Sequence, residues 1–110
     1  MGRHILAVLT SPTPGMEDEF NDWYTNVHLP DVLKLNDFKS AQRFRFVAQR
    51  PDDKPLHRYL ALYEVETDDV PATQRLLEET AGTPAMPFSP AIDIPSAVAW
   101  YYEEITEKLT

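Results

Sequence analysis

Four stretches of the chain combine apolar and β-branched residues over lengths typical of β-strands. The first, HILAVLT at residues 4–10, is a continuous apolar run, which is typical of a strand buried on both faces. Residues 38–49 and 57–67 predict two further strands joined by the polar turn RPDDKP, and residues 97–105 predict a last strand. We therefore expect a four-stranded sheet.

The segment between the first two strands has the period of an amphipathic helix. Its large apolar side chains recur at i, i+4, i+7, i+8 and i+11, which places on one helical face Met16, Phe20, Trp23, Tyr24 and Val27. Thr13 predicts an N-cap, and Pro14 suits the first turn. Pro30 disfavours helical backbone at the preceding residue, so we expect the helix to end near His28 and a short turn to restart at Pro30, with Asn36 as its left-handed stop.

A second helix is predicted over roughly residues 70–81. Asp68 or Asp69 supplies its N-cap and Gly82 its end, and the inward positions are Leu76, Leu77 and Ala81. The next segment, residues 83–96, holds four prolines, which exclude regular structure. Two interpretations of this segment stay open, a lid over a pocket and a plain connector.

The element order is therefore β-α-β-β-α-β within a single domain, residues 1–110. This order predicts an α+β fold, a ferredoxin-like plait with both helices on one face of an antiparallel sheet. In the usual plait, the first and third strands are central and the second and fourth are edges. The sequence agrees with this arrangement, because the first and third strands carry apolar residues at both odd and even positions (both parities), and therefore on both faces of the sheet.

Apolar residues at both parities leave one face of the sheet without a cover, since two helices cover only the other face. A second copy of the same sheet is the simplest partner. We therefore expect a homodimer that packs sheet against sheet. The alternative is a monomer in which the proline-rich segment covers part of the open face.

Composition and charge narrow the class of partner. The formal net charge is −8, from 18 acidic and 10 basic residues, which opposes binding to nucleic acid. The apolar run at the start of the chain is about six residues long, too short for a membrane span or a signal peptide. No cysteine is present, as is usual in a reducing compartment. The expectation is a soluble cytoplasmic protein that contacts neither nucleic acid nor membrane.

His28 is the leading candidate for chemistry. It follows Tyr24 by four residues, so both side chains share one face if the helix extends that far. A new helical turn at Pro30 would place positive potential beside the imidazole, lower its pKa and leave a neutral acid or base at pH 7. The alternative interpretation is that His28 only ends the helix and hydrogen-bonds a backbone carbonyl.

Other side chains are weaker candidates, and each also has a purely structural interpretation. The potential substrate-binding residues are Phe20, Trp23, His4, Asp31 and Tyr101. Arg43 and Arg45 suit a substrate carboxylate or, more simply, either a solvated edge or salt bridges across the dimer with Glu64 or Glu103. The spacing of His and acidic residues predicts no metal site, and three glycines form no phosphate-binding loop, so we expect no cofactor.

The segment EFNDWYTNVHLPDVLKLNDFKSAQRFRF resembles the dimeric α/β-barrel superfamily, and within it the EthD-like proteins. The matching positions are an acidic helix start, a Trp-Tyr pair, His-x-Pro and a strand with S-A-x-R-F, which here are Glu19, Trp23, Tyr24, His28, Pro30, Ser40, Ala41, Arg43 and Phe44. The resemblance implies a dimer with a ligand pocket between each sheet and its two helices.

What the resemblance implies about function is a cofactor-independent enzyme for a small aromatic or polyketide-like compound. Proton-transfer chemistry of the isomerase, cyclase or dehydratase (lyase) type is expected, with His28 and Tyr24 as catalytic residues. Two alternatives stay open. One is a non-catalytic module that binds or senses a small ligand, and the other is a cofactor-free monooxygenase.

Overall fold

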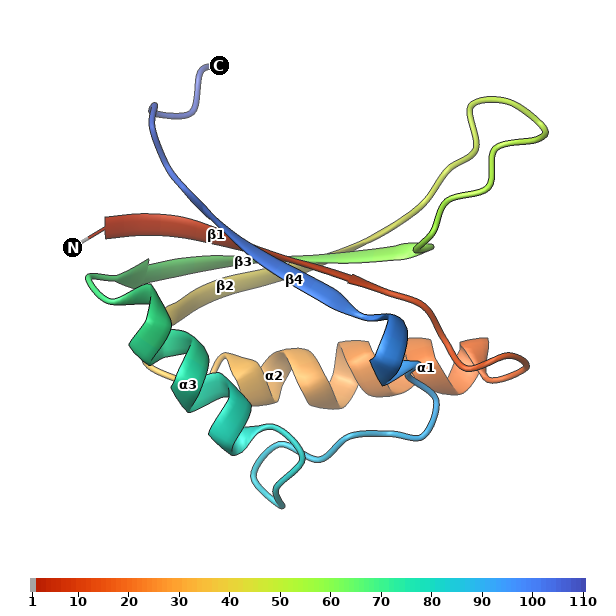
Figure 1. Cartoon of the computed structure of the whole chain (residues 1–110), viewed down its shortest axis with the longest axis horizontal. Coiled ribbons are helices and arrows are strands. Elements are labelled where there is room, and N and C mark those ends of the chain that lie inside the picture. Colours follow the sequence, from red (N-terminus) through yellow and green to blue (C-terminus); the bar gives the residue numbers. More distant parts are fainter. Residues whose placement is uncertain (1) are drawn as a thin grey trace.

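The sheet contains the four predicted strands and is antiparallel throughout (Figure 1). The computed structural model describes residues 2–110. The strands run in the order β2-β3-β1-β4, and their bounds are Gly2–Thr10 for β1, Phe38–Arg45 for β2, Tyr59–Thr67 for β3 and Val98–Glu103 for β4. The strands that are apolar at both parities, β1 and β3, are therefore the central ones, as predicted.

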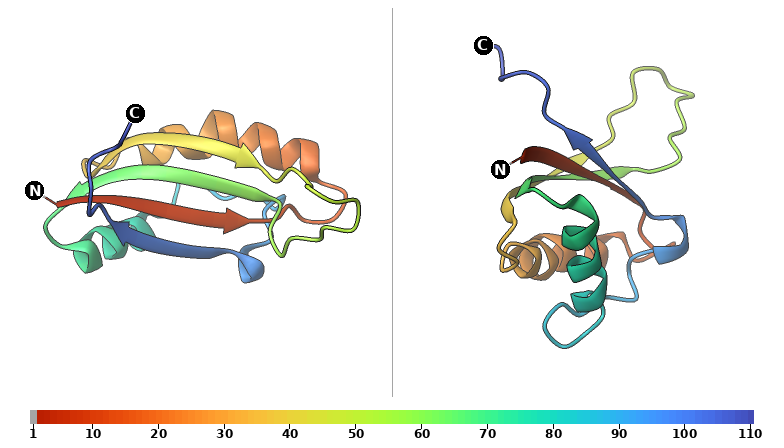
Figure 2. Two further views of the ribbon diagram at one scale, coloured as in Figure 1. Left: turned by 90° about the horizontal axis from the view of Figure 1, so that it is seen from above. Right: turned by 60° about the vertical axis from the view of Figure 1, so that its left-hand side comes forward.

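Two helical segments cover one face of the sheet, and the other face is left bare (Figure 2). The first segment consists of α1 (Glu17–Trp23), the π-helical turn η1 (Tyr24–His28) and α2 (Leu29–Val32), which follow one another without a break. The second is α3 (Val70–Thr80). In the proline-rich segment, the only helical turn among the described residues is the 3₁₀ turn η2 (Ile94–Ser96).

The prediction that the first helix ends near His28 is wrong. The backbone stays right-handed helical through Leu29, where φ is −57° and ψ is −48°. The turn widens instead, because the N–H of Leu29 donates to the carbonyl of Tyr24, five residues back. This wider turn precedes Pro30, whose ring would otherwise crowd the preceding carbonyls and which has no N–H to donate.

The widened turn also changes which side chain is buried. Val27, predicted on the apolar face, is 38% exposed, and His28 is buried with Tyr24 and Val32. Thr13 does not cap the helix, because its hydroxyl donates to the carbonyl of Pro90 and α1 begins without a side-chain cap. Asn36 also fails as a left-handed stop, since the described residues with positive φ are glycines.

The predicted limits of α3 agree closely with the structure. The Asp69 side chain accepts from the N–H of Ala72, and Gly82 follows the helix with φ of 84°. Leu77 and Ala81 pack against the core, but Leu76 is 46% exposed, and Thr73 takes the buried position in its place. The Thr73 hydroxyl donates to Asp37, which ties the helix to the start of β2.

The core lies between the sheet and the helices. On β3 every second residue is buried, from Tyr59 through Tyr63 to Thr67. These side chains meet Phe20 and Tyr24 from the first helix, with the Phe20 ring 5.2 Å from Tyr59 and 5.5 Å from Tyr24. Alternate residues along β3 thus fix which side of the sheet the helices cover.

The bare face of the sheet is apolar across its central rows. Cross-strand partners point to the same side, so one row contains Val98, Leu9, Leu60 and Phe44, and the next contains Trp100, Ala7, Leu62 and Gln42. Trp100 is 58% exposed and Tyr102 is 60% exposed. The loop after β2 and the C-terminal residues both rise on this side of the sheet, as Figure 1 shows. Among the described residues, no helix has the length and hydropathy needed to cross a bilayer.

Candidate functional site

A cavity of about 350 Å³ lies between the sheet and helix α3. This volume is within the range of small-molecule sites in proteins. Most of its wall is apolar, and the polar residues that line it are Thr10, Tyr24, His28, Tyr63, Gln74 and Glu78. Among the described residues that line the cavity, none is a lysine or an arginine. The lining therefore favours an uncharged ligand with a few hydrogen-bonding groups.

His28 lies in an aromatic surround at this cavity. Its ring stacks on Trp23 with centroids 4.9 Å apart, meets Tyr24 edge-on at 5.1 Å and lies 5.7 Å from Phe88. Burial lowers the pKa of His28 to about 4, whereas the charge of Asp31 acts in the opposite direction. The imidazole is therefore neutral at pH 7. The helix terminus at Pro30, expected from the sequence to lower this pKa, does not exist, and burial is the cause instead.

The Nδ1 atom of His28 is buried without a hydrogen-bond partner among residues 2–110. The alternative interpretation, in which the ring only satisfies a backbone carbonyl, finds no support in this geometry. A buried and unpaired nitrogen costs free energy that a hydrogen bond would recover. The ring is thus held by stacking rather than by hydrogen bonds.

Two phenols from different elements stand beside His28. Tyr24 comes from the π-helical turn and Tyr63 from β3, and each phenol affects the ionisation of the other. Burial raises the pKa of both tyrosines, and that of Tyr63 is raised further by Tyr24. Both phenols are protonated at pH 7 and can donate hydrogen bonds.

Two further polar side chains reach the cavity from opposite sides. Gln74 on α3 accepts a hydrogen bond of 2.8 Å from the Tyr101 hydroxyl, which leaves its amide N–H₂ as a donor. Thr10 on β1 is 1% exposed, and its hydroxyl has no partner in the described chain. Burial raises the pKa of Tyr101 to about 12, with Glu78 and Asp37 adding to it, so Tyr101 stays a donor to Gln74.

The proline-rich segment forms part of the cavity wall. Phe88 lines the cavity, and Met86 is fully buried in the core. The indole N–H of Trp23 donates to the carbonyl of Pro87 at 3.2 Å, and the N–H of Thr13 donates to the carbonyl of Ala91. Of the two interpretations left open by the sequence, a segment that covers a pocket is the one that fits these contacts.

The other candidate residues lie outside the cavity lining. Phe20 and Trp23 are core residues that support Tyr24 and His28 from behind. Asp31 pairs with Lys34 at 3.3 Å and acts on His28 only through its charge. His4 stands at the start of β1, with its Nδ1 atom buried and unpartnered, away from the cavity that His28 lines. No group of three His, Asp or Glu side chains within residues 2–110 has the geometry of a metal site.

Arg43 differs from its predicted environment. It does not lie on a solvated edge. Its guanidinium turns toward the helices and hydrogen-bonds Asn21 and Thr25, and Glu64 instead accepts from Ser40. The parity of β2 explains this, because Arg43 pairs with Ala61 on the buried side of β3.

Residues 4–83 match the model of a family described as a domain of unknown function, DUF4286. The chain belongs to this family. The match spans the first helix, His28 and the strands that carry Thr10 and Tyr63, so most of the candidate site lies within the DUF4286 domain. No curated protein matches the chain.

A solved structure shares the fold. It is the crystal structure of an ethyl tert-butyl ether D (EthD) family protein from Bacillus halodurans, with a TM-score of 0.52 and 16% identity, covering 96% of this chain and 100% of that one. The likeness to EthD-like proteins expected from the sequence is therefore confirmed for the fold. At 16% identity this likeness shows the fold alone and assigns no role to any residue. The family model that matches this chain is DUF4286, whereas the solved structure is described as an EthD family protein.

Proposed function

We propose that this protein is a cofactor-independent enzyme that performs proton-transfer chemistry on a small, uncharged aromatic or polyketide-like compound. The observation that supports it is the neutral, buried imidazole of His28 beside the phenols of Tyr24 and Tyr63 in a largely apolar cavity. Strongly perturbed titratable groups that meet in a cavity are typical of active sites.

The proposed chemistry begins with removal of a proton. The His28 imidazole takes the proton from a carbon next to a substrate carbonyl, and a phenol of the tyrosine pair donates a hydrogen bond to the enolate oxygen that forms. Return of the proton to another carbon isomerises the substrate. Attack of the enolate carbon on a second carbonyl closes a ring, and protonation of a departing hydroxyl group dehydrates the compound.

The low pKa of His28 restricts the substrate. An imidazole whose pKa is about 4 is a weak base, so it removes only a proton that is already acidic. Carbons between two carbonyl groups, or between a carbonyl and an aromatic ring, meet this condition. Polyketide-like compounds are rich in such carbons, which is the reason to prefer them over simple ketones.

We further propose that the protein is a homodimer of the dimeric α/β-barrel type, joined through the bare face of the sheet. The support is the apolar central rows of that face and the exposed side chains on the two segments that rise beside it, Leu56, Ile105 and Leu109, which are 87–92% exposed. Exposed apolar area of this kind is typical of an association surface.

The test is solvent deuterium exchange, followed by NMR, in a panel of neutral aromatic ketones and 1,3-diketones, with 2-tetralone first. We expect the protein to accelerate exchange at the acidic carbon of a bound compound and His28→Gln to abolish the acceleration. Compounds that bind but exchange at the rate seen in buffer would contradict the enzyme and favour a binding module. Oxygen consumption with a bound compound would favour a cofactor-free monooxygenase.

A further inference from the structure

Arg43 places a positive charge over a cluster of aromatic rings. It lies in β2 on the helix side of the sheet, and its guanidinium carbon is 4.6 Å from the centroid of the Tyr24 ring. The rings of Phe20 and Tyr59 are each 5.3 Å from the same carbon. Arginine over an aromatic face is attracted by the ring electrons, more strongly when it is partly withdrawn from water, as Arg43 is.

The hydrogen-bond partners of Arg43 are all neutral. The guanidinium donates to the Asn21 side-chain oxygen and to the Thr25 hydroxyl, each at 2.9 Å, and to the backbone carbonyl of Asn21 at 3.4 Å. Within residues 2–110, no carboxylate lies at ion-pair distance from Arg43. A partly buried arginine usually faces a carboxylate. Its charge is therefore not neutralised by a neighbour and acts on the nearby phenols.

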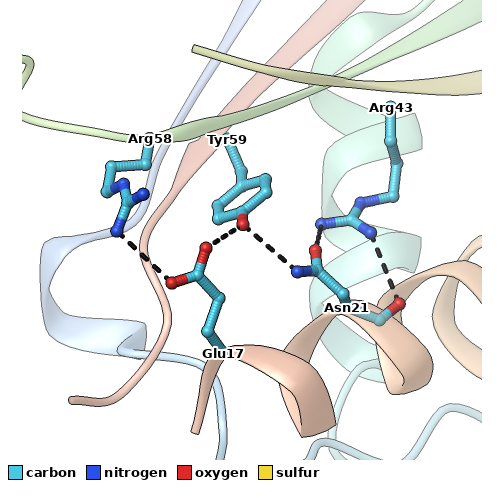
Figure 3. A network of polar contacts seen from close by, with 5 residues as sticks. All are labelled: Glu17, Asn21, Arg43, Arg58 and Tyr59. Carbon is cyan, nitrogen blue, oxygen red and sulfur yellow. Dashed lines mark hydrogen bonds and ion pairs between the residues drawn. The ribbon is translucent and has the colours of Figure 1, made fainter. Parts of the chain in front are cut away.

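A chain of polar contacts fixes this arrangement (Figure 3). The Asn21 amide nitrogen donates to the Tyr59 hydroxyl at 3.1 Å, which turns its oxygen toward Arg43. Tyr59 in turn donates to the Glu17 carboxylate. Glu17 also pairs with Arg58 at 3.3 Å, so its negative charge is engaged at the far end of the chain and not at Arg43.

Tyr24 is the cavity group that this charge reaches. The groups that face Tyr24 are Arg43 from β2, Tyr63 from β3, His28 from its own helix, and Gln74 and Glu78 across the cavity on α3. Arg43 is the cation in this set, since His28 is neutral at pH 7. A nearby positive charge favours the ionised form of a phenol. The charge of Arg43 acts in this direction on both Tyr24 and Tyr63.

We propose that Arg43 is a positioning residue whose fixed charge makes Tyr24, rather than Tyr63, the phenol that donates to a substrate in the cavity. Of the rings that Arg43 covers, Tyr24 is the nearest at 4.6 Å and Tyr63 is not among them, so the charge acts more strongly on Tyr24 than on Tyr63. This inference rests on the proposed function, but the charge relationship between Arg43 and Tyr24 is measurable without a substrate.

The experiment is a ¹⁹F NMR titration of protein labelled with 3-fluorotyrosine, since fluorine lowers the pKa of every phenol into an accessible range. The chain has five tyrosines, and Tyr24→Phe assigns the signal of interest. In Arg43→Gln, which keeps hydrogen-bond donors but loses the charge, we expect the Tyr24 midpoint to move to higher pH. Arg43→Lys should restore most of the wild-type midpoint. The matched control is Arg58→Gln, which removes the other arginine of the chain of contacts.

The proposal is overturned if Arg43→Gln leaves the Tyr24 midpoint unchanged, or moves it no further than Arg58→Gln does. The signal of Tyr102, which is 60% exposed on the opposite face, provides the internal reference and should not move. If Arg43→Gln does not fold, Asn21→Leu provides a second test. This variant keeps the charge of Arg43 but removes the side-chain hydrogen bond that holds its guanidinium in place, so we expect a smaller shift of the Tyr24 midpoint to higher pH. No shift in that variant would also count against the proposal.

Failure of this inference and failure of the proposed function give different results. If the Tyr24 midpoint shifts as expected but His28→Gln leaves deuterium exchange unaffected, the enzyme proposal fails and the coupling between Arg43 and Tyr24 stands. If exchange depends on His28 but the midpoint does not respond to Arg43, only the role of Arg43 is wrong. With a substrate identified, Arg43→Gln should lower kcat more than it raises KM.

Discussion

Trp23 and His28 lie five residues apart in the sequence, yet their rings stack with centroids 4.9 Å apart and an interplanar angle of 27°. On an ordinary α-helix, residues three and four apart share a face, and residues five apart do not. The π-helical turn over Tyr24–His28 brings the two rings into line. The same turn keeps Tyr24 next to His28 at 5.1 Å, so one irregularity assembles both the support and the partner of the histidine.

The depressed pKa of His28 predicts a specific dependence of stability on pH. Its folded pKa of about 4 lies below the unfolded value of 6.5, so the unfolded chain binds the proton more readily between these values. Stability therefore falls as pH drops from 6.5 towards 4, by about 2 kcal/mol between pH 7 and pH 5 from this residue alone. Urea denaturation of the wild type and His28→Gln at both pH values checks this. Equal losses in the two proteins would show that His28 is not the cause.

We expect Thr10→Val to have opposite effects on the stability of the protein and on its affinity for a ligand. The hydroxyl of Thr10 is buried and unpaired, so a methyl group of the same shape should leave the ligand-free protein equally stable or more stable by about 1 kcal/mol. Affinity for a ligand that hydrogen-bonds Thr10 should fall. Thermal denaturation and a binding titration measure the two effects. A clear loss of stability would mean that the hydroxyl has a partner in the folded protein.

Met86 anchors the proline-rich segment, and its truncation should weaken the cavity wall. The side chain is 0% exposed, so Met86→Ala should cost about 2 to 5 kcal/mol of unfolding free energy. Hydrogen exchange should also increase at residues 83–96. Leu76→Ala is the control, because Leu76 is 46% exposed on α3, away from the proposed dimer face, and its truncation should change both quantities much less. A cost of Met86→Ala below that range would mean that the segment is held mainly by its backbone hydrogen bonds.

The proposed dimer predicts that a charge on the bare face of the sheet separates the subunits. Trp100→Glu should give a folded monomer near the chain mass of 12.6 kDa, whereas the wild type should have about twice that mass by light scattering. Leu76→Glu is the matched control, since Leu76 is 46% exposed on α3 at the other face. A wild type of 12.6 kDa at all concentrations would contradict the dimer.

The order of elements and the central strands followed from the sequence because both depend on local patterns. The apolar parities of β1 and β3, and the Asp69 cap with Gly82 at the other end of α3, are signals carried by neighbouring residues. The course of the first helix did not follow, because Pro30 permits two outcomes. A proline can end a helix or be accommodated by a wider turn, and the packing of Trp23 and His28 decides between them.

The candidate site was only partly visible in the sequence. His28 and Tyr24 stood out because they are close in the chain, whereas Tyr63, Thr10 and Gln74 come from three separate elements. Tyr63 carried one available signal, a polar hydroxyl at a buried parity of a central strand. The position of Arg43 depended on which side of β2 faces the helices, and the irregular register between Phe38 and Ser40 obscures this in the sequence.

The π-helical turn also bears on how this chain should be compared with others. It holds one residue more than the α-helical turn it replaces, so a chain with an uninterrupted helix would need one residue fewer between Trp23 and Pro30. An alignment that allows no gap inside a helix would then place a different residue opposite His28. A relative whose histidine occupies the same position in space would then appear, in that alignment, to lack it.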